Sequence, residues 1–404
     1  MSVVSQVRVT GPLAGFADGF AARLAELGYT PLPAANQRRV MARLSRWLAA
    51  GELAPAGLDA GRVEAFLADC RASGYTCWLS GRGVAPLLGY LRGLGVVPGP
   101  ACDPPATAAE LLLERYGGYL GGERGLAAST IGWYVAEARL FLGRAAAAGL
   151  GGLAGLTAAG VRDFVAAECR GRSTGSAKSV VTALRSLLRF LLAEGLITAD
   201  LAGTVPAVAG WRGGGLPKAL PAGQVEAMLA SCDRGTAVGS RDFAVLTLLS
   251  RLGLRACEVA ALALDDIDWR AGEIVIRGKG RRDERLPLPA DAGEALAGYL
   301  AGGRPAGGRS RKVFLRACAP QGELSADAVK AVVRSACGRA GLAPVGAHRL
   351  RHTAAVAMLQ AGSPLAEIGQ VLRHRSAATT AIYLKVDHSA LRALAVPWPG
   401  GDLR

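Results

Sequence analysis

The sequence contains 404 residues, of which 51% are hydrophobic, and its formal net charge at pH 7 is +15. A chain of this length is too long for one compact core and too apolar for a disordered protein, so two or three folded domains are expected. The positive charge is spread along the chain and favours a polyanionic partner such as nucleic acid, although charge alone does not separate such a protein from an ordinary basic one.

Helical periodicity dominates the first half of the chain. Apolar residues recur at helical spacing in residues 16–27, 40–48, 63–67, 131–142 and 180–192. Clusters of proline and glycine interrupt this pattern at residues 97–105 and 213–217, and such clusters are typical of linkers. The sequence therefore predicts three segments, residues 1–98, 105–205 and 217–404.

The first two of these segments resemble each other. Apolar residues of the first recur in the second at an offset of 98 and then of 100, as in the pairs Phe66–Phe164, Leu67–Val165, Leu87–Leu187 and Leu91–Leu191. A duplicated helical module is one interpretation, and chance agreement between two bundles rich in Ala and Leu is the other. A duplicated first module would place four arginines on one helix, where they either meet DNA phosphates or form a solvated face. These arginines are Arg38, Arg39, Arg43 and Arg46.

The third segment mixes helices with strands. Helical patterns cover residues 225–229 and 243–249. Glu273–Ile276 and Arg285–Leu288 are typical of two short strands, joined by the polar loop 277–284. Helices resume from about Ala326.

The eight cysteines show no Cys-x-x-Cys pair and no metal-ligand spacing with histidine. Reduced and mostly buried thiols are expected, with Cys257 inside a helical apolar pattern. The conspicuous uncharged run at residues 145–161 is too short and too rich in glycine to span a bilayer, and the N-terminus lacks a signal-peptide pattern. We expect a soluble cytoplasmic protein without a membrane partner.

Residues suited to phosphate chemistry gather in the third segment. All four histidines lie within the last 57 residues, and His348 and Arg351 are three apart, so that on a helix they share one face. Taken singly, each candidate has an ordinary explanation, such as an ion pair between Arg255 and Glu258. Their joint order and spacing are harder to explain by chance. In chain order the candidates are Arg255, Lys279, His348, Arg351, His374 and Tyr383.

In this order and spacing, residues 217–390 resemble the catalytic domain of the tyrosine recombinases, also called phage integrases. The motif of that family is Arg, Lys, His-x-x-Arg, His or Trp, and Tyr, and every position is filled here. One residue departs from the pattern: Arg373 precedes the second histidine where the family usually has Gly, so that its local packing or a DNA contact stays open. The resemblance implies a mainly α fold, with helical N-terminal DNA-binding modules, a core-binding domain at 105–205, and a mostly helical catalytic domain with a small antiparallel sheet.

The same resemblance implies an enzyme that cuts and rejoins double-stranded DNA through a 3′-phosphotyrosine bond to Tyr383. A phosphodiester gains negative charge in its five-coordinate transition state, and the two motif arginines would supply fixed positive charge there. Lys279, on a loop flanked by glycines, could protonate the leaving 5′-oxygen. His348 is expected to assist proton transfer at Tyr383, and His374 to donate a hydrogen bond to the phosphate. With these groups present, neither a metal nor another cofactor is expected.

Family members act as four protomers on two DNA sites, so the resemblance implies a homotetramer on DNA within the nucleoid, with further recombinases as accessory partners. The apolar tail residues Leu391, Leu394, Val396 and Trp398 would dock onto a neighbour or onto the same chain. Two alternatives stay open: a DNA-binding accessory relative without catalysis, and a type IB topoisomerase. The additional N-terminal module favours an integrase or transposase of a mobile element over a housekeeping resolvase.

Overall fold

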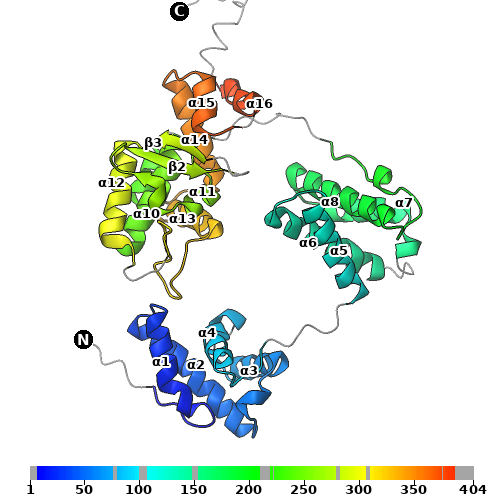
Figure 1. Cartoon of the computed structure of the whole chain (residues 1–404), viewed down its shortest axis with the longest axis vertical. Coiled ribbons are helices and arrows are strands. Elements are labelled where there is room, and N and C mark those ends of the chain that lie inside the picture. Colours follow the sequence, from blue (N-terminus) through cyan, green and yellow to red (C-terminus); the bar gives the residue numbers. More distant parts are fainter. Residues whose placement is uncertain are drawn as a thin grey trace, which may run out of the picture. The chain divides into compact units, whose positions relative to one another are not determined.

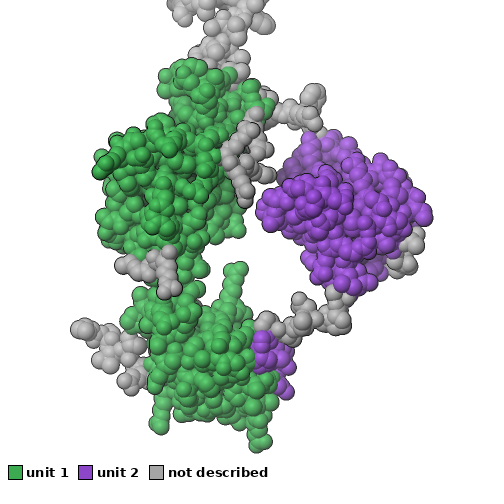
Figure 2. Space-filling model, in the orientation of Figure 1, with its two compact units in different colours: residues 1–58, 64–97, 215–404 green, residues 59–63, 98–214 purple. Residues whose placement is uncertain are grey.

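The computed structural model describes residues 7–75, 80–99, 107–147, 153–209, 219–221, 223–278, 283–305, 310–374 and 376–386. The chain divides into two compact units, which are coloured separately in Figure 2. One unit contains residues 1–58, 64–97 and 215–404, and the other contains residues 59–63 and 98–214. None of the helices in the described ranges is long and apolar enough to cross a membrane.

The helices before residue 98 follow the predicted periodicity. They are α1 (Ala17–Glu26), α2 (Pro31–Ala50), α3 (Ala60–Ala72) and α4 (Gly81–Gly93). A proline in the first turn of α2 costs no hydrogen bond, because the N–H groups there have no partner within the helix. The Ser80 hydroxyl accepts a hydrogen bond from the backbone nitrogen of Gly83 and so caps α4. Helix α2 packs against both α1 and α4.

A second group of helices follows in the chain and is drawn in teal to green in Figure 1. It contains α5 (Ala108–Gly122), α6 (Ala128–Ala147), α7 (Ala158–Cys169) and α8 (Thr174–Ala193). The hydroxyls of Thr107, Thr157 and Ser173 cap α5, α7 and α8, each accepting a hydrogen bond from the backbone nitrogen three residues later. Helix α6 packs against α5 and α8, and α7 also packs against α8.

Residues paired by the sequence repeat occupy buried positions in both groups. This holds for the pairs Phe66–Phe164, Leu67–Val165, Leu87–Leu187 and Leu91–Leu191. An aromatic pair also joins the first and last helix of each group. The ring centroids of Phe20 and Tyr90 are 5.4 Å apart, and those of Tyr116 and Phe190 are 5.1 Å apart. The two groups therefore share these buried positions and an aromatic contact between their first and last helices.

The third group surrounds a central helix, α10 (Ala237–Arg251), whose residues Val245, Leu248 and Leu249 are fully buried. Helix α10 packs against α12, α13 and α14 (Figure 1). The other helices of the group are α9 (Gln224–Ala230), α11 (Ala256–Ala261), α12 (Ala290–Gly298), α13 (Ala326–Arg339), α14 (Ala347–Gln360), α15 (Leu365–Val371) and α16 (Ala377–Thr380).

A small antiparallel sheet lies within this group, in the order β1 (Ile267–Asp268), β2 (Glu273–Arg277) and β3 (Asp283–Pro287). Ile274 and Leu286 are paired across β2 and β3, and both are buried in the core. The predicted second strand, Arg285–Leu288, is wrong in its bounds. Backbone pairing with β2 begins earlier, at Asp283 opposite Arg277, because ladder hydrogen bonds do not require apolar side chains. The mainly helical fold with a small antiparallel sheet is confirmed.

The expectation of mostly buried thiols is wrong for part of the set. The six described cysteines are all free; Cys70, Cys232 and Cys337 are buried, whereas Cys257 and Cys318 are exposed. Cys257 lies in the first turn of α11, where Glu258 and Val259 point inward instead.

Candidate active site

Helix α14 carries three of the site's side chains. It begins after Gly346, and its inner face is formed by residues such as Leu350, Ala354 and Ala355. Arg351 shares this inner face and is only 1% exposed. A buried guanidinium needs polar partners to offset its desolvation. The groups that supply these partners surround Arg351 at the centre of the site.

Two backbone carbonyls hold Arg351 in place. Its Nη1 donates a hydrogen bond of 2.6 Å to the oxygen of Gly253, and its Nη2 donates one to the oxygen of Leu372. Burial, followed by the charge of Arg255, lowers the pKa of Arg351 to about 10, which leaves it protonated at neutral pH. Gly253 has φ +57°, and a Cβ there would lie 2.5 Å from Leu372 Cδ2, so the turn before α11 requires glycine.

Arg255 precedes α11 and is tied to Glu258. The Glu258 carboxylate accepts a 2.7 Å hydrogen bond from the Arg255 backbone nitrogen and one of 2.6 Å from Arg255 Nη1. The Glu258 side chain is 3% exposed, whereas that of Arg255 is 39% exposed. Arg255 therefore offers its outer edge to a ligand while its inner edge is fixed.

The structure places Arg373 in a buried position next to Glu258 and at the edge of a cavity. It is 7% exposed, has φ +55°, and its Nη2 lies 2.8 Å from Glu258 Oε2. Burial alone would raise the pKa of Glu258, but the charge of Arg373 and the hydrogen bonds from Arg255 outweigh it and lower that pKa. A direct contact with phosphate would require Arg373 to leave Glu258.

Tyr383 lies in the short helical segment Ala381–Val386 and is 1% exposed. Its hydroxyl lies 2.9 Å from Nδ1 of His352. Burial raises the pKa of Tyr383 and, with the neighbouring His348, lowers that of His352. The phenol is therefore protonated and His352 is neutral at neutral pH, which gives the Tyr383 hydroxyl a proton acceptor within hydrogen-bond distance.

His352 is absent from the predicted candidates, and His348 is expected in its place. The His348 ring instead packs edge-on against His352, with centroids 4.4 Å apart. Within the described ranges, the hydrogen-bond partner of the Tyr383 hydroxyl is His352. The signal is present in the sequence, because His352 follows His348 by four residues and so shares its helix face.

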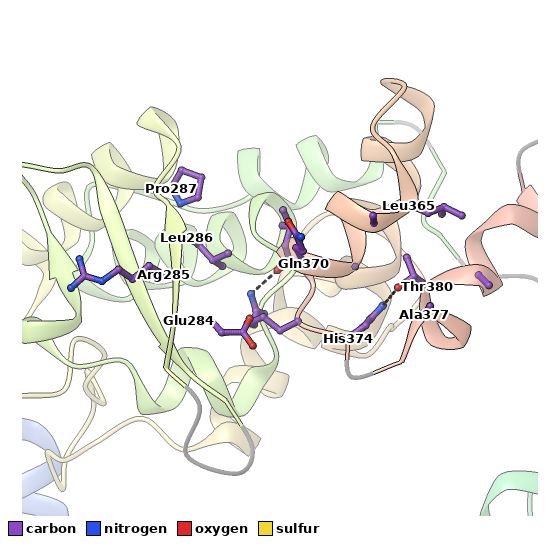
Figure 3. A pocket seen from close by; sticks show the side chains of 14 residues that line it. Glu284, Arg285, Leu286, Pro287, Leu365, Gln370, His374, Ala377 and Thr380 are labelled. Carbon is purple, nitrogen blue, oxygen red and sulfur yellow. Dashed lines mark hydrogen bonds between the residues drawn. The ribbon is translucent and has the colours of Figure 1, made fainter.

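The His374 ring also lies near Tyr383, with the two rings nearly parallel at 8° and their centroids 6.3 Å apart. Its Nδ1 is 2.8 Å from the hydroxyl oxygen of Thr380, and a dashed line marks this hydrogen bond in Figure 3. Burial, followed by the charges of Arg351 and Arg255, lowers the pKa of His374 to about 4. If the Thr380 hydroxyl donates to Nδ1, the proton of the neutral ring sits on Nε2 and is available to a ligand.

Two cavities adjoin these residues. One, of about 990 Å³, lies between β3 and the helices α15 and α16, and Figure 3 shows His374 and Thr380 at its edge. The other, of about 660 Å³, is lined by Arg255 and His348 and by two cations of α13, Lys330 and Arg334. The second cavity therefore gives an anionic ligand access to Arg255.

Lys279 and the tail residues after position 386 lie outside the described residues. The strands that lead to Lys279 are placed, since β2 ends at Arg277 and β3 begins at Asp283. Arg277 also pairs with the buried carboxylate of Asp266 at 2.8 Å, which fixes the base of the loop that carries Lys279.

The four arginines of the first segment all lie on α2, but each has a partner within that segment. Of the four, Arg46 is exposed and the others are half-buried. The contacts are Arg38 with the oxygen of Val7 at 3.1 Å, Arg39 with Asn36 at 2.5 Å, Arg43 stacked over the ring of Tyr75 at 3.9 Å, and Arg46 with the oxygen of Ala42 at 3.3 Å. A phosphate contact by the whole set would require these interactions to rearrange.

Comparison with known proteins places this site in a family. Residues 218–390 match the model of the phage integrase family, and residues 113–195 match that of the phage integrase N-terminal SAM-like domain. A Sinorhizobium fredii protein named as integrase/recombinase y4rA is 41% identical, over 96% of this chain and 95% of its own. Tyrosine recombinase XerD of Mycobacterium tuberculosis is 35% identical, over 73% of this chain and 98% of its own.

Solved structures share the fold. XerH site-specific recombinase bound to palindromic difH substrate covers 82% of this chain and 93% of its own, with a TM-score of 0.56 and 20% identity. A lambda integrase dimer bound to a COC′ core site covers 73% of this chain and 99% of its own, with a TM-score of 0.53 and 18% identity. Because the relatives at 41% and 35% identity are covered over 95% and 98% of their length, and the domain models also match, the chain belongs to the phage integrase family of tyrosine recombinases.

Proposed function

We propose that this tyrosine recombinase cleaves and rejoins double-stranded DNA at specific sites, with Tyr383 as the nucleophile. The observation that carries the proposal is the convergence on Tyr383 of a neutral proton acceptor, His352, and a fixed guanidinium, Arg351. The relatives of known structure named above are bound to DNA, which supports a duplex as the partner.

The cleavage step uses these groups once the Tyr383 hydroxyl has reached the scissile phosphate with its contact to His352 kept. The Tyr383 oxygen attacks the scissile phosphorus and forms a P–O bond, while its proton passes to Nδ1 of His352. The bond from phosphorus to the 5′-oxygen breaks, and Lys279 supplies the proton that this oxygen needs. The 3′-phosphotyrosine keeps the energy of the broken bond, so that a 5′-hydroxyl from the partner duplex can attack it and release Tyr383.

The positively charged side chains stabilise the negative charge that develops on the non-bridging oxygens of the phosphate. Arg255 presents the exposed edge of its guanidinium, and Arg351 is held by two carbonyls that fix its direction. His374 would donate from Nε2, because its Nδ1 faces Thr380. Donors that are oriented before the reaction do not have to reorganise in the transition state, which is where their contribution to catalysis arises.

This arrangement is a resting one. Because Tyr383 is 1% exposed, the segment Ala381–Val386 must shift before the hydroxyl can reach a phosphate. Arg351 is equally buried, at 1% exposed, so the same shift must also open its guanidinium to the phosphate, while its backbone anchors stay in place. DNA binding is therefore linked to exposure of the nucleophile in this proposal.

For the rest of the chain, we propose domains at residues 1–98, 105–205 and 217–404, the first a duplicate of the second. The matched burial and the matched aromatic pairs of the two helical groups support the duplication. The protein would act as four protomers on two DNA sites, in the integration, excision or transposition of a mobile element.

A nicked duplex that traps the covalent intermediate tests the function. The wild-type protein should form a DNA adduct that maps to Tyr383, and Tyr383→Phe should form none while its DNA affinity stays within about twofold, since only a hydroxyl is removed. An adduct on another tyrosine, such as Tyr299, would overturn the assignment. Relaxation of supercoiled DNA that lacks paired sites would instead indicate a topoisomerase.

A further inference from the structure

A buried ion pair in the site involves a residue that departs from the family pattern. Arg373 stands where glycine is usual, and its φ of +55° is in the left-handed region that glycine adopts without strain. An L side chain is disfavoured there, yet Arg373 is 7% exposed and its guanidinium reaches Glu258 at 2.8 Å. The side chain must therefore make interactions that offset an unfavourable backbone.

The partner of Arg373 is the residue that holds Arg255. Glu258 Oε1 accepts from Arg255 Nη1, and Oε2 accepts both from the Arg255 backbone nitrogen and from Arg373 Nη2. The side chains of Glu258 and Arg373 are each 3% exposed. Water screens the charges of such a buried pair only weakly, so a substitution of Arg373 changes the electrostatic environment of Glu258.

Hydrogen bonds from Arg351 and Arg373 connect two turns of the chain at the site. Arg351 bridges the carbonyls of Gly253 and Leu372, which belong to the turns before α11 and after α15. Arg373 follows Leu372 directly, and its side chain returns to Glu258 in the first turn of α11. Two turns that are far apart in sequence are thus joined once through Arg351 and a second time through Arg373.

We propose that Arg373 is a positioning residue for strand cleavage, which acts on the scissile phosphate through Glu258 and Arg255. This inference rests on the role of Arg255 proposed above. Arg255, Glu258 and Arg373 together carry one net positive charge, and without Arg373 they would carry none. Glu258 Oε2, which now binds the Arg255 backbone nitrogen and Arg373, would then be free to bind the Arg255 guanidinium as well and draw that guanidinium away from the phosphate.

Substitution of Arg373 tests this route. Arg373→Gly removes the positive charge and also the strain of a side chain in the left-handed backbone region, so the protein should fold. A melting curve checks this expectation. We expect single-turnover cleavage of nicked DNA to slow by roughly 10-fold, below the roughly 10²-fold or more expected for removal of a direct donor. The Kd for DNA should change by less than about twofold. Arg373→Lys keeps the charge and should recover part of the rate.

Two comparisons separate positioning from a merely structural effect. In an Arg255→Ala background, Arg373→Gly should slow cleavage by less than about twofold, because the residue through which it acts is gone. On DNA with an uncharged methylphosphonate at the scissile position, the defect should also shrink. A matched control is Arg241→Ala. Arg241 pairs with another buried carboxylate, that of Asp242, at 2.7 Å, and its loss should leave the cleavage rate unchanged.

The outcomes are distinct. A full cleavage rate in Arg373→Gly overturns the inference, and so does an equal decrease in rate in the wild-type and Arg255→Ala backgrounds. If Arg255→Ala itself cleaves normally, the proposed role of Arg255 fails instead. Should Arg373→Gly not fold, Arg373→Lys and Arg373→Asn carry the same comparison, since asparagine tolerates the left-handed backbone.

Discussion

Substitution of His352 is the sharpest test of how Tyr383 is activated. The Tyr383 hydroxyl lies 2.9 Å from His352 Nδ1, and burial raises the pKa of the tyrosine while lowering that of the histidine. His352→Asn keeps a polar side chain of similar reach but cannot take up a proton. General-base catalysis contributes roughly 10²- to 10⁴-fold, so cleavage at pH 7 should slow by at least about 10²-fold.

The pH dependence makes this prediction specific. A base whose folded pKa is below 6.5 is neutral above that pKa, so the wild-type rate should stay level down to about pH 6.5 and fall only as the pH drops through the folded value. In His352→Asn the phenolate must form by itself. Its rate should therefore rise about tenfold per pH unit across the alkaline range, because the pKa of Tyr383 is above 10.0.

Rapid-quench measurement of adduct formation on nicked DNA, at saturating protein and several pH values, provides the assay. His348→Asn is the matched control, since His348 contacts His352 and not the hydroxyl, and the decrease in its rate should be the smaller one. An unchanged rate and pH profile in His352→Asn, together with a large decrease in His348→Asn, would restore His348 as the proton acceptor and refute the reasoning.

Three further predictions concern the loop, the turn and the first helical group. Lys279→Ala should be slow on normal DNA but recover on DNA with a 5′-thiol leaving group, because a thiolate leaves without a proton; equal damage on both would exclude Lys279 as the acid. Gly253→Ala should lower the melting temperature and slow cleavage by at least about tenfold, because its Cβ would lie 2.5 Å from Leu372 Cδ2; wild-type behaviour would contradict the tight turn. Deletion of residues 1–98 should shorten the DNA footprint and flatten the salt dependence of binding, by about one unit of log slope for each phosphate that the shortened protein no longer neutralises, with cleavage of a nicked site retained. An unchanged footprint and slope would leave assembly as the role of this group.

Much of the fold could be predicted because it follows from local patterns. The helical periodicity of residues 40–48 and 180–192 lies within α2 and α8, and alternation around Ile274 and Ile276 marks β2. These signals depend on neighbours within one or two turns of chain. The start of β3 at Asp283 escapes such a pattern because its pairing with β2 is a backbone interaction that polar side chains do not reveal.

The site could be predicted as a set of residues but not as a set of interactions. Spacing shows that His348 and His352 share a face of α14, but not which of them meets Tyr383, which follows His352 by 31 positions. In the same way, the sequence marks Arg373 as unusual without showing that it points inward to Glu258, 115 positions earlier. Interactions at such separations are set by the packing of α11, α14 and α15, which local periodicity does not encode.

The resting position of Tyr383 also bears on how cleavage is controlled. A tyrosine that is 1% exposed, with a raised pKa, is a poor nucleophile toward any phosphate that reaches the protein by chance. Of the cations that would activate the phosphate, Arg255 has a side chain that is 39% exposed, whereas Arg351 is as buried as Tyr383 but is fixed by backbone carbonyls. Phosphate capture and nucleophile exposure are thus carried by separate segments, and the reaction needs both. A movement of Ala381–Val386 that depends on correct DNA binding would restrict cleavage to assembled sites, although the cationic half of the site is formed beforehand.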